Sequence, residues 1–142
     1  MTDGRWETRR RVRWGECDPA GVVYTPRFAE YVADAFHEYL EYLLGAPLQR
    51  SLEALDVSTP CKALRFVFHH ALHPDDELAL AVGVAAIRTR TFDLAIEGRL
   101  AGELAFEAVF TAICVHHTVR KSREIPPRLR ERLEWDRARV SR

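Results

Sequence analysis

Residues 25–47 read TPRFAEYVADAFHEYLEYLLGAP, with apolar side chains recurring every three or four positions. That spacing places them on one face of an α-helix and the charged residues on the other. Thr25 is a suitable N-cap, Pro26 suits the first helical position and Gly45 suits the C-terminal stop. The pattern predicts one amphipathic helix over residues 26–44, about five turns long.

The segments on either side of this helix alternate large and polar side chains, which is typical of strands with one buried face. Upstream, residues 6–14 alternate with Trp6, Val12 and Trp14 on one side, which predicts a half-exposed first strand. Downstream, four further runs share this period: residues 61–72, 78–88, 92–100 and 104–117. Turn residues separate the runs, so we expect five strands in all.

Two further helices are expected. A short one covers residues 48–55, and Leu129 and Leu133, four positions apart in the charged tail 128–142, predict a surface helix. The order of one strand, a long helix and four strands favours an α+β domain with an antiparallel sheet packed over the helix. The 142 residues suit a single domain, 1–142. One face of such a sheet stays uncovered, so we expect a dimer.

Composition excludes several classes of function. Lys and Arg number 21, as do Asp and Glu, and a neutral chain does not suit extended nucleic-acid binding. No apolar run approaches the roughly 20 residues of a membrane span. Three cysteines without C-x-x-C spacing suit reduced thiols in the cytoplasm. The histidine pairs 69–70 and 116–117 lie on expected strands, where neighbours point to opposite faces, so no metal site is expected.

Asp18 is the first candidate functional residue. It lies between two glycines, in a segment that interrupts the strand pattern just before the long helix. A carboxylate there is close to the positive end of the helix dipole, as a catalytic group would be. Asp-Pro is also a common turn dipeptide. The pattern alone therefore leaves two interpretations, a turn residue and a catalytic carboxylate.

The segment WGECDPAGVVYTPRF, residues 14–28, resembles the signature of hotdog-fold acyl-CoA thioesterases of the 4-hydroxybenzoyl-CoA thioesterase family. That signature runs G-[DE]-x-D-x-x-G-[IV]-V-[YFW]-x-x-x-[YF], and every fixed position is matched. The similarity continues more weakly through Thr59 and Pro60, the turn at 75–78 and the hairpin at 88–92. It covers most of residues 6–125.

The resemblance implies a hotdog fold, in which a five-stranded antiparallel sheet wraps a long central helix. It also implies dimers that commonly pair into tetramers, with the active site between subunits. Asp18 is then the general base for water or the nucleophile that attacks the acyl carbon. The backbone N–H of Thr25, at the helix N-terminus, is the expected donor to the developing oxyanion. No metal or cofactor is implied, because coenzyme A is part of the substrate.

The phosphates of coenzyme A need a local basic cluster on a neutral protein. The candidates are Arg88, Arg90, Arg120, Lys121 and Arg123, and the alternative interpretation is an ordinary solvated charged edge. Further candidate substrate contacts are Tyr24, Phe28 and Thr59. Relatives that accept a 4-hydroxylated ring carry an aspartate where this chain has Ala33. An unsubstituted benzoyl or another small acyl group therefore fits better.

The expected activity is hydrolysis of a small, aromatic, benzoyl-type acyl-CoA to the free acid and coenzyme A. One alternative is a thioesterase for short-chain aliphatic acyl-CoA or acyl-carrier-protein substrates. A third hypothesis, from a different class, is a hotdog protein that binds acyl-CoA without turnover.

Overall fold

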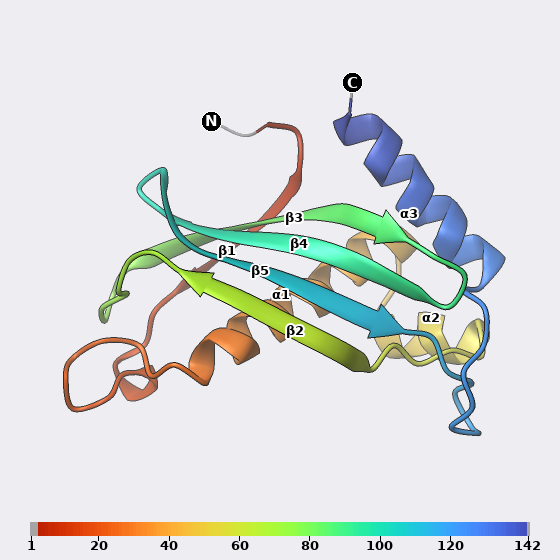
Figure 1. The fold of residues 1–142 in the computed structure, drawn as a ribbon, viewed down its shortest axis with the longest axis horizontal. Coiled ribbons are helices and arrows are strands. Elements are labelled where there is room, and N and C mark those ends of the chain that lie inside the picture. Colours follow the sequence, from red (N-terminus) through yellow and green to blue (C-terminus); the bar gives the residue numbers. More distant parts are fainter. Residues whose placement is uncertain (1–2, 142) are drawn as a thin grey trace.

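The computed structural model describes residues 3–141 and contains one five-stranded antiparallel sheet in the order β1-β3-β4-β5-β2 (Figure 1). The strands are β1 (Trp6–Arg11), β2 (Cys61–Phe68), β3 (Glu77–Ile87), β4 (Thr91–Leu100) and β5 (Glu103–Ile113). The helices are α1 (Arg27–Leu44), α2 (Leu48–Ala54) and α3 (Pro127–Val140), with a 3₁₀ turn, η1, at Trp14–Glu16. The predicted α+β order is confirmed.

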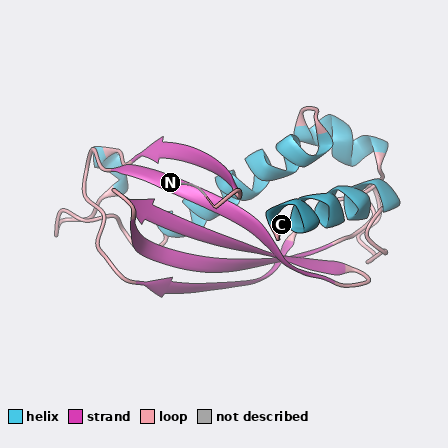
Figure 2. Cartoon of the chain, turned by 90° about the horizontal axis from the view of Figure 1, so that it is seen from above, coloured by secondary structure: helices cyan, strands magenta, loops and turns pink. Residues whose placement is uncertain are grey.

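Helix α1 lies along one face of the sheet, and the opposite face carries no helix (Figure 2). Its buried residues follow the predicted spacing: Phe28, Tyr31, Val32, Ala35, Phe36, Tyr39, Leu40 and Leu43. The helix ends where predicted, because Gly45 adopts the left-handed conformation (φ 72°) and its N–H donates to the Glu41 carbonyl. Burial of this apolar face holds the sheet around the helix.

The inward faces of the strands also follow the sequence pattern. On β3, Leu78, Leu80 and Val82 are buried against the helix side, and Ala79 and Ala81 point to the other face. None of the helices among residues 3–141 is long and apolar enough to cross a membrane.

Three strands are shorter than predicted. The first ends at Arg11, and Trp14 lies on the 3₁₀ turn with 84% of its surface exposed, so its predicted inward position is wrong. The strand predicted over 61–72 ends at Phe68, because the N–H groups of His69 and His70 both donate to one carbonyl, that of Ala105.

The strand predicted over 104–117 likewise ends at Ile113. Beyond it, Val115 forms isolated bridges with Ser58 and Ser122 in place of a continued ladder. The histidine pairs therefore lie just outside the strands on which they were placed.

Helix α3 is more deeply integrated than a surface helix. Leu129 and Leu133 are fully buried, and α3 packs against β3 and α1. The buried Asp136 carboxylate accepts hydrogen bonds from the Tyr39 hydroxyl at 2.6 Å and from Arg139 at 2.7 and 2.9 Å. Burial, followed by this contact with Asp136, raises the pKa of Tyr39 far above its usual range. The C-terminal segment is thus part of the core.

Candidate active site

Asp18 lies in a short closed loop between η1 and α1. Its N–H donates to the Val22 carbonyl and the Gly21 N–H donates to the Asp18 carbonyl, both at 2.9 Å. The Asp18 Oδ1 accepts a hydrogen bond from the Ala20 N–H at 2.8 Å. Its Oδ2 accepts none from residues 3–141. One carboxylate oxygen therefore stabilises the turn, and the other is available to a reactant. The side chain is suited both to the turn role and to the catalytic role that the sequence left open.

The start of α1 differs from the prediction. Pro26 is the N-cap, with helical φ and ψ of −61° and −21°, and no side chain makes a capping hydrogen bond there. The predicted capping role of the Thr25 side chain is therefore wrong, because Pro26 already continues the helical geometry backwards. The Thr25 N–H donates to no group within residues 3–141, and Thr25 is exposed. This N–H is free at the positive end of the helix.

Glu16 anchors the base of the Asp18 loop. Its Oε1 accepts hydrogen bonds from the Arg13 N–H and the Tyr31 hydroxyl, each at 2.8 Å, and its Oε2 lies 3.3 Å from Arg10 Nη2. Burial alone would raise the pKa of Glu16, but these hydrogen bonds and the charge of Arg10 lower it. The Tyr31 ring also lies beneath the Arg10 guanidinium, 4.4 Å away. The sequence matched Glu16 to a fixed motif position but gave it no role.

Two cavities flank the segment 24–25. The first, about 260 Å³, is lined by Asp18, Tyr24 and Arg27 among others, and Tyr24 is half exposed. The second, about 280 Å³, is lined by Thr25 and Phe28 with residues that follow β2. In that cavity Phe28 is buried and meets the Phe68 ring edge to face, with centroids 5.0 Å apart. Asp18 and Tyr24 thus border one cavity and Thr25 and Phe28 the other, on the two sides of the segment that leads into α1.

The basic candidates lie elsewhere. The loop before α1 is at one end of the sheet and the β3–β4 turn at the other, separated by the length of β3, roughly 35 Å (Figure 1). Arg88 and Arg90 are in that distant turn, and Lys121 and Arg123 follow β5 nearby. Within one chain, these residues do not converge on Asp18.

The basic side chains differ in how far they are already engaged. Arg88 makes a two-point ion pair with Asp93 at 3.0 and 2.8 Å. Arg123 uses three of its five N–H groups on the carbonyls of residues 55, 56 and 124. Arg90 makes one hydrogen bond, to Ser122 at 3.3 Å, and Lys121 is exposed. Arg90 and Lys121 therefore keep the most capacity for a phosphate.

Thr59 lines a third cavity, of about 420 Å³, at the same distant end. His37, His117 and Arg120 also line it, and it lies between α1, α2 and the segment after β5. Arg120 is one of the predicted phosphate contacts, whereas the sequence pattern assigned no role in the site to His37 or His117. No group of three or more His, Cys, Asp or Glu side chains within residues 3–141 is arranged to hold a metal ion.

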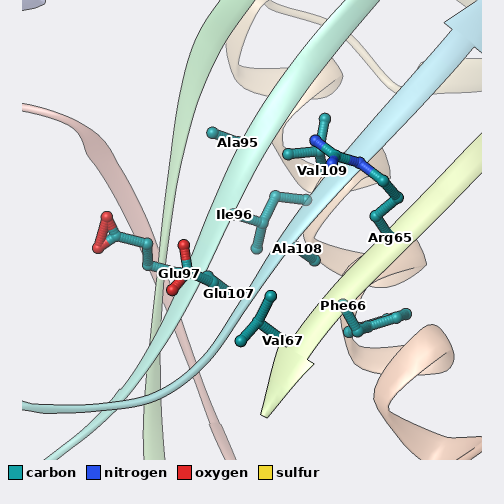
Figure 3. Close-up of a pocket in the computed structure, with 9 residues that line it drawn as sticks. All are labelled: Arg65, Phe66, Val67, Ala95, Ile96, Glu97, Glu107, Ala108 and Val109. Carbon is teal, nitrogen blue, oxygen red and sulfur yellow. The ribbon is translucent and has the colours of Figure 1, made fainter. Parts of the chain in front are cut away.

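The uncovered face of the sheet carries a separate open cavity of about 490 Å³ (Figure 3). Arg65 and Val67 of β2 border it together with Glu107 and Val109 of β5. It contains no residue that the sequence predicted for the site, and α1 lies on the opposite side of the sheet.

Comparison with known proteins identifies the family. The chain matches the thioesterase-like superfamily over residues 12–133. The chain belongs to this superfamily. The match includes the Asp18 loop and strands β2 to β5, and it begins just after β1. No curated protein matches the chain in sequence.

Solved structures support the assignment to the thioesterase-like superfamily. A thioesterase-superfamily protein from Jannaschia sp. CCS1 is 25% identical, with a TM-score of 0.88 over 95% of this chain and 94% of that one. A 1,4-dihydroxy-2-naphthoyl-CoA thioesterase from Synechocystis is 22% identical, with a TM-score of 0.78 over 89% and 93% of the two chains.

A third similar structure is an aspartate-to-asparagine mutant of 4-hydroxybenzoyl-CoA thioesterase, in complex with 4-hydroxybenzoyl-CoA. It is 18% identical, with a TM-score of 0.83 over 90% of this chain and 97% of that one. The hotdog fold implied by the resemblance is confirmed, and the protein is a thioester hydrolase.

Proposed function

We propose that this thioesterase hydrolyses a small, aromatic, benzoyl-type acyl-CoA to the free acid and coenzyme A. The observation that carries the proposal is the pairing, around the start of α1, of a carboxylate with one oxygen unused and an N–H without an acceptor. These are Asp18 and Thr25. They are the two groups that thioester hydrolysis needs, a base or nucleophile and an oxyanion donor.

In the general-base route, Asp18 takes a proton from water as the water oxygen attacks the thioester carbon. The carbonyl oxygen becomes an oxyanion, to which the Thr25 N–H donates at the positive end of α1. Collapse of the tetrahedral intermediate breaks the C–S bond and releases coenzyme A, which receives the proton from Asp18. In the alternative route Asp18 attacks first, and water then hydrolyses the mixed anhydride. Both routes use the same two groups.

The choice of acyl group rests on aromatic side chains and on a missing carboxylate. Tyr24 borders the cavity beside Asp18 and Phe28 borders the cavity beside Thr25, and flat rings suit such surroundings. Ala33 offers no acceptor to a ring hydroxyl, and the neighbouring Asp34 carboxylate is held by Arg10 at 2.8 Å. Two of the similar structures are named as thioesterases of aromatic acyl-CoA, which favours the same class.

The proposed active site is shared between two copies of the chain. Strand β2 is an edge of the sheet, and its Val67 and Phe68 are about half exposed. A two-fold axis beside β2 would pair the strand antiparallel with its copy. Thr59 of the partner subunit, just before its β2, would then approach the Phe68 end that lies beside Thr25. The partner's basic cluster would reach the same site.

Such a dimer would join the two halves of the site that one chain separates. The proposal needs no metal and no resident cofactor, since a carboxylate and an N–H carry the chemistry. We place the reaction in the cytoplasm, where the three free cysteines would stay reduced. The dimer is the smallest assembly that completes the proposed site, and two such dimers form the tetramer that the family resemblance implies.

The test is thiol release from benzoyl-, 4-hydroxybenzoyl-, phenylacetyl-, acetyl- and hexanoyl-CoA by the wild type and Asp18→Asn. Asparagine keeps the Oδ1 acceptor for the Ala20 N–H, so the loop should keep its shape. Asp75→Asn, at an exposed turn, is the matched control. We expect aryl-selective turnover that falls by orders of magnitude in Asp18→Asn alone.

Other outcomes identify other functions. If acetyl- and hexanoyl-CoA are turned over as fast as the aryl esters or faster, the proposed substrate is aliphatic and not aromatic. Absence of turnover on every CoA ester would favour an acyl-carrier-protein substrate or a binding protein. Full activity of Asp18→Asn would remove Asp18 from the mechanism.

A further inference from the structure

Two buried tyrosines on α1, eight residues apart, make the same kind of contact, in which a hydroxyl donates to a carboxylate. The Tyr31 hydroxyl donates to Glu16 at 2.8 Å, and the Tyr39 hydroxyl donates to Asp136 at 2.6 Å. Both tyrosines are fully buried, and both carboxylates are nearly so. The second contact ties α1 to α3. The first ties α1 to the segment that carries Asp18.

Glu16 is two residues before Asp18 and forms the base of its loop. The backbone carbonyl of Glu16 accepts from the Tyr24 N–H at 3.0 Å, so this residue also holds the returning strand of the loop. Its side chain is bound on three sides, by Arg13, Tyr31 and Arg10. Glu16 therefore connects both ends of the loop to the second turn of α1.

The rest of the loop has few ties to the body of the protein. Residues 19–21 are exposed, and the hydrogen bonds of Asp18 stay within the loop. The other backbone tie at its base runs from the Val23 N–H to the Leu72 carbonyl at 2.8 Å. That bond fixes the loop relative to the segment after β2 but not relative to α1. The last residues of the loop are tied to α1 by the N–H groups of Arg27 and Phe28, which donate to the Tyr24 and Thr25 carbonyls at 2.8 and 3.2 Å. The Glu16 contact with Tyr31 ties the first residues of the loop to α1 as well.

We propose that Glu16 and Tyr31 are positioning residues that hold the Asp18 carboxylate at its working distance from the Thr25 N–H. The proposal rests on the proposed function, since it assumes that both groups act on one thioester. Neither Glu16 nor Tyr31 lies where a substrate could reach its polar atoms, because both are buried. Their contribution to the rate is geometric, and misplacement of a reacting group by about 1 Å is costly.

The experiment compares Tyr31→Phe with Tyr39→Phe. Each change removes one hydroxyl that donates to a buried carboxylate, so both variants should unfold at a similarly lowered temperature. We expect kcat to fall roughly tenfold or more in Tyr31→Phe, with KM changed less than about twofold. Tyr39→Phe should keep wild-type kcat, because its contact leads to α3. Kinetics are measured with whichever acyl-CoA of the panel is hydrolysed fastest.

A second pair of variants separates position from charge. Glu16→Gln keeps an amide oxygen that can accept from Tyr31 and the Arg13 N–H, and it should retain most of kcat. Glu16→Ala removes the acceptor and should resemble Tyr31→Phe. Rescue by glutamine is an outcome that a purely electrostatic role of Glu16 would not give.

Defined results would overturn the proposal. Equal kcat in Tyr31→Phe and Tyr39→Phe would make both contacts structural only. A Glu16→Gln variant as slow as Glu16→Ala would show that the charge of Glu16 matters and its position does not. Asp18→Asn is run alongside: if it stays active, the proposed function itself fails. If it is inactive and Tyr31→Phe is normal, the positioning role alone is wrong.

Discussion

Two carboxylates two residues apart, those of Glu16 and Asp18, have contrasting surroundings. Glu16 is buried and accepts from a backbone N–H and a phenol, whereas Asp18 is partly exposed and uses one oxygen to accept a hydrogen bond within its turn. The first environment stabilises a fixed anion, and the second leaves an oxygen available for proton transfer. Different environments for neighbouring acids are a common way to divide a structural role from a chemical one.

The lowered pKa of Glu16 makes a prediction for stability in acid. Its pKa in the folded chain is below the ordinary value of 4.5, so its contribution is present above about pH 4.5 and lost as pH falls through the folded pKa. Glu16→Gln lacks this contribution. The difference in unfolding free energy between the wild type and Glu16→Gln should therefore shrink as pH falls from 7 to 3. Urea titrations measure it, and a constant difference would contradict the assignment.

Gly98 is required by its neighbour across the sheet. It pairs with Phe106, and a Cβ at Gly98 would overlap the ring of Phe106, which is itself fixed edge to face against Phe28. Gly98→Ala should therefore destabilise the protein by about 1–3 kcal/mol. Gly83→Ala is the control, because its Cβ would meet only the flexible Arg5 side chain at 3.2 Å. Chemical denaturation should show a clear loss for Gly98→Ala and little for Gly83→Ala.

At the scale of elements, the sequence predicted which segments form helices and which form strands better than it predicted the residues at which they end. Helix α1 was predictable within one residue because its period is long and Gly45 terminates it. The ends of β1, β2 and β5 could not be predicted as closely, because each depends on where the partner strand ends. At Ala105, for example, one carbonyl captures two N–H groups and turns the chain out of the sheet. The burial of Asp136 was equally hidden, since its partner Tyr39 is 97 residues away.

The two arginines of the β3–β4 turn should behave differently. Arg88 is engaged by Asp93, whereas Arg90 makes a single hydrogen bond to Ser122. If this turn holds the phosphates of coenzyme A, Arg90→Ala should raise KM about threefold to tenfold with kcat nearly unchanged. Arg88→Ala should raise KM less, because its guanidinium already serves a carboxylate. Steady-state kinetics decide, and an unchanged KM in both variants would make the turn an ordinary charged edge.

At the scale of the whole molecule, the sequence predicted best the part of the site whose residues are close together along the chain. Asp18, Tyr24, Thr25 and Phe28 lie within one motif, and the fold keeps them around the start of α1. The basic candidates come from distant segments, and the fold carries them to the far end of the sheet. Sequence reasoning could name them but had no means of showing that separation, which depends on the direction of β3.

A shared site predicts that two defective variants restore each other. Asp18→Asn and Arg90→Glu are co-expressed with different affinity tags, and the mixed dimer is purified beside both parents. If the site joins Asp18 of one chain to Arg90 of the other, each mixed dimer has one intact site and one doubly altered site. The purified mixed dimer should then recover about one half of wild-type activity, measured at substrate concentrations far below KM. If each chain built its site alone, no intact site would form, and the mixed dimer would show only the mean of its two parents. Recovery above that mean therefore requires Arg90 to act on the partner's thioester site, and it would explain why a fold that keeps Asp18 and Arg90 apart retains both.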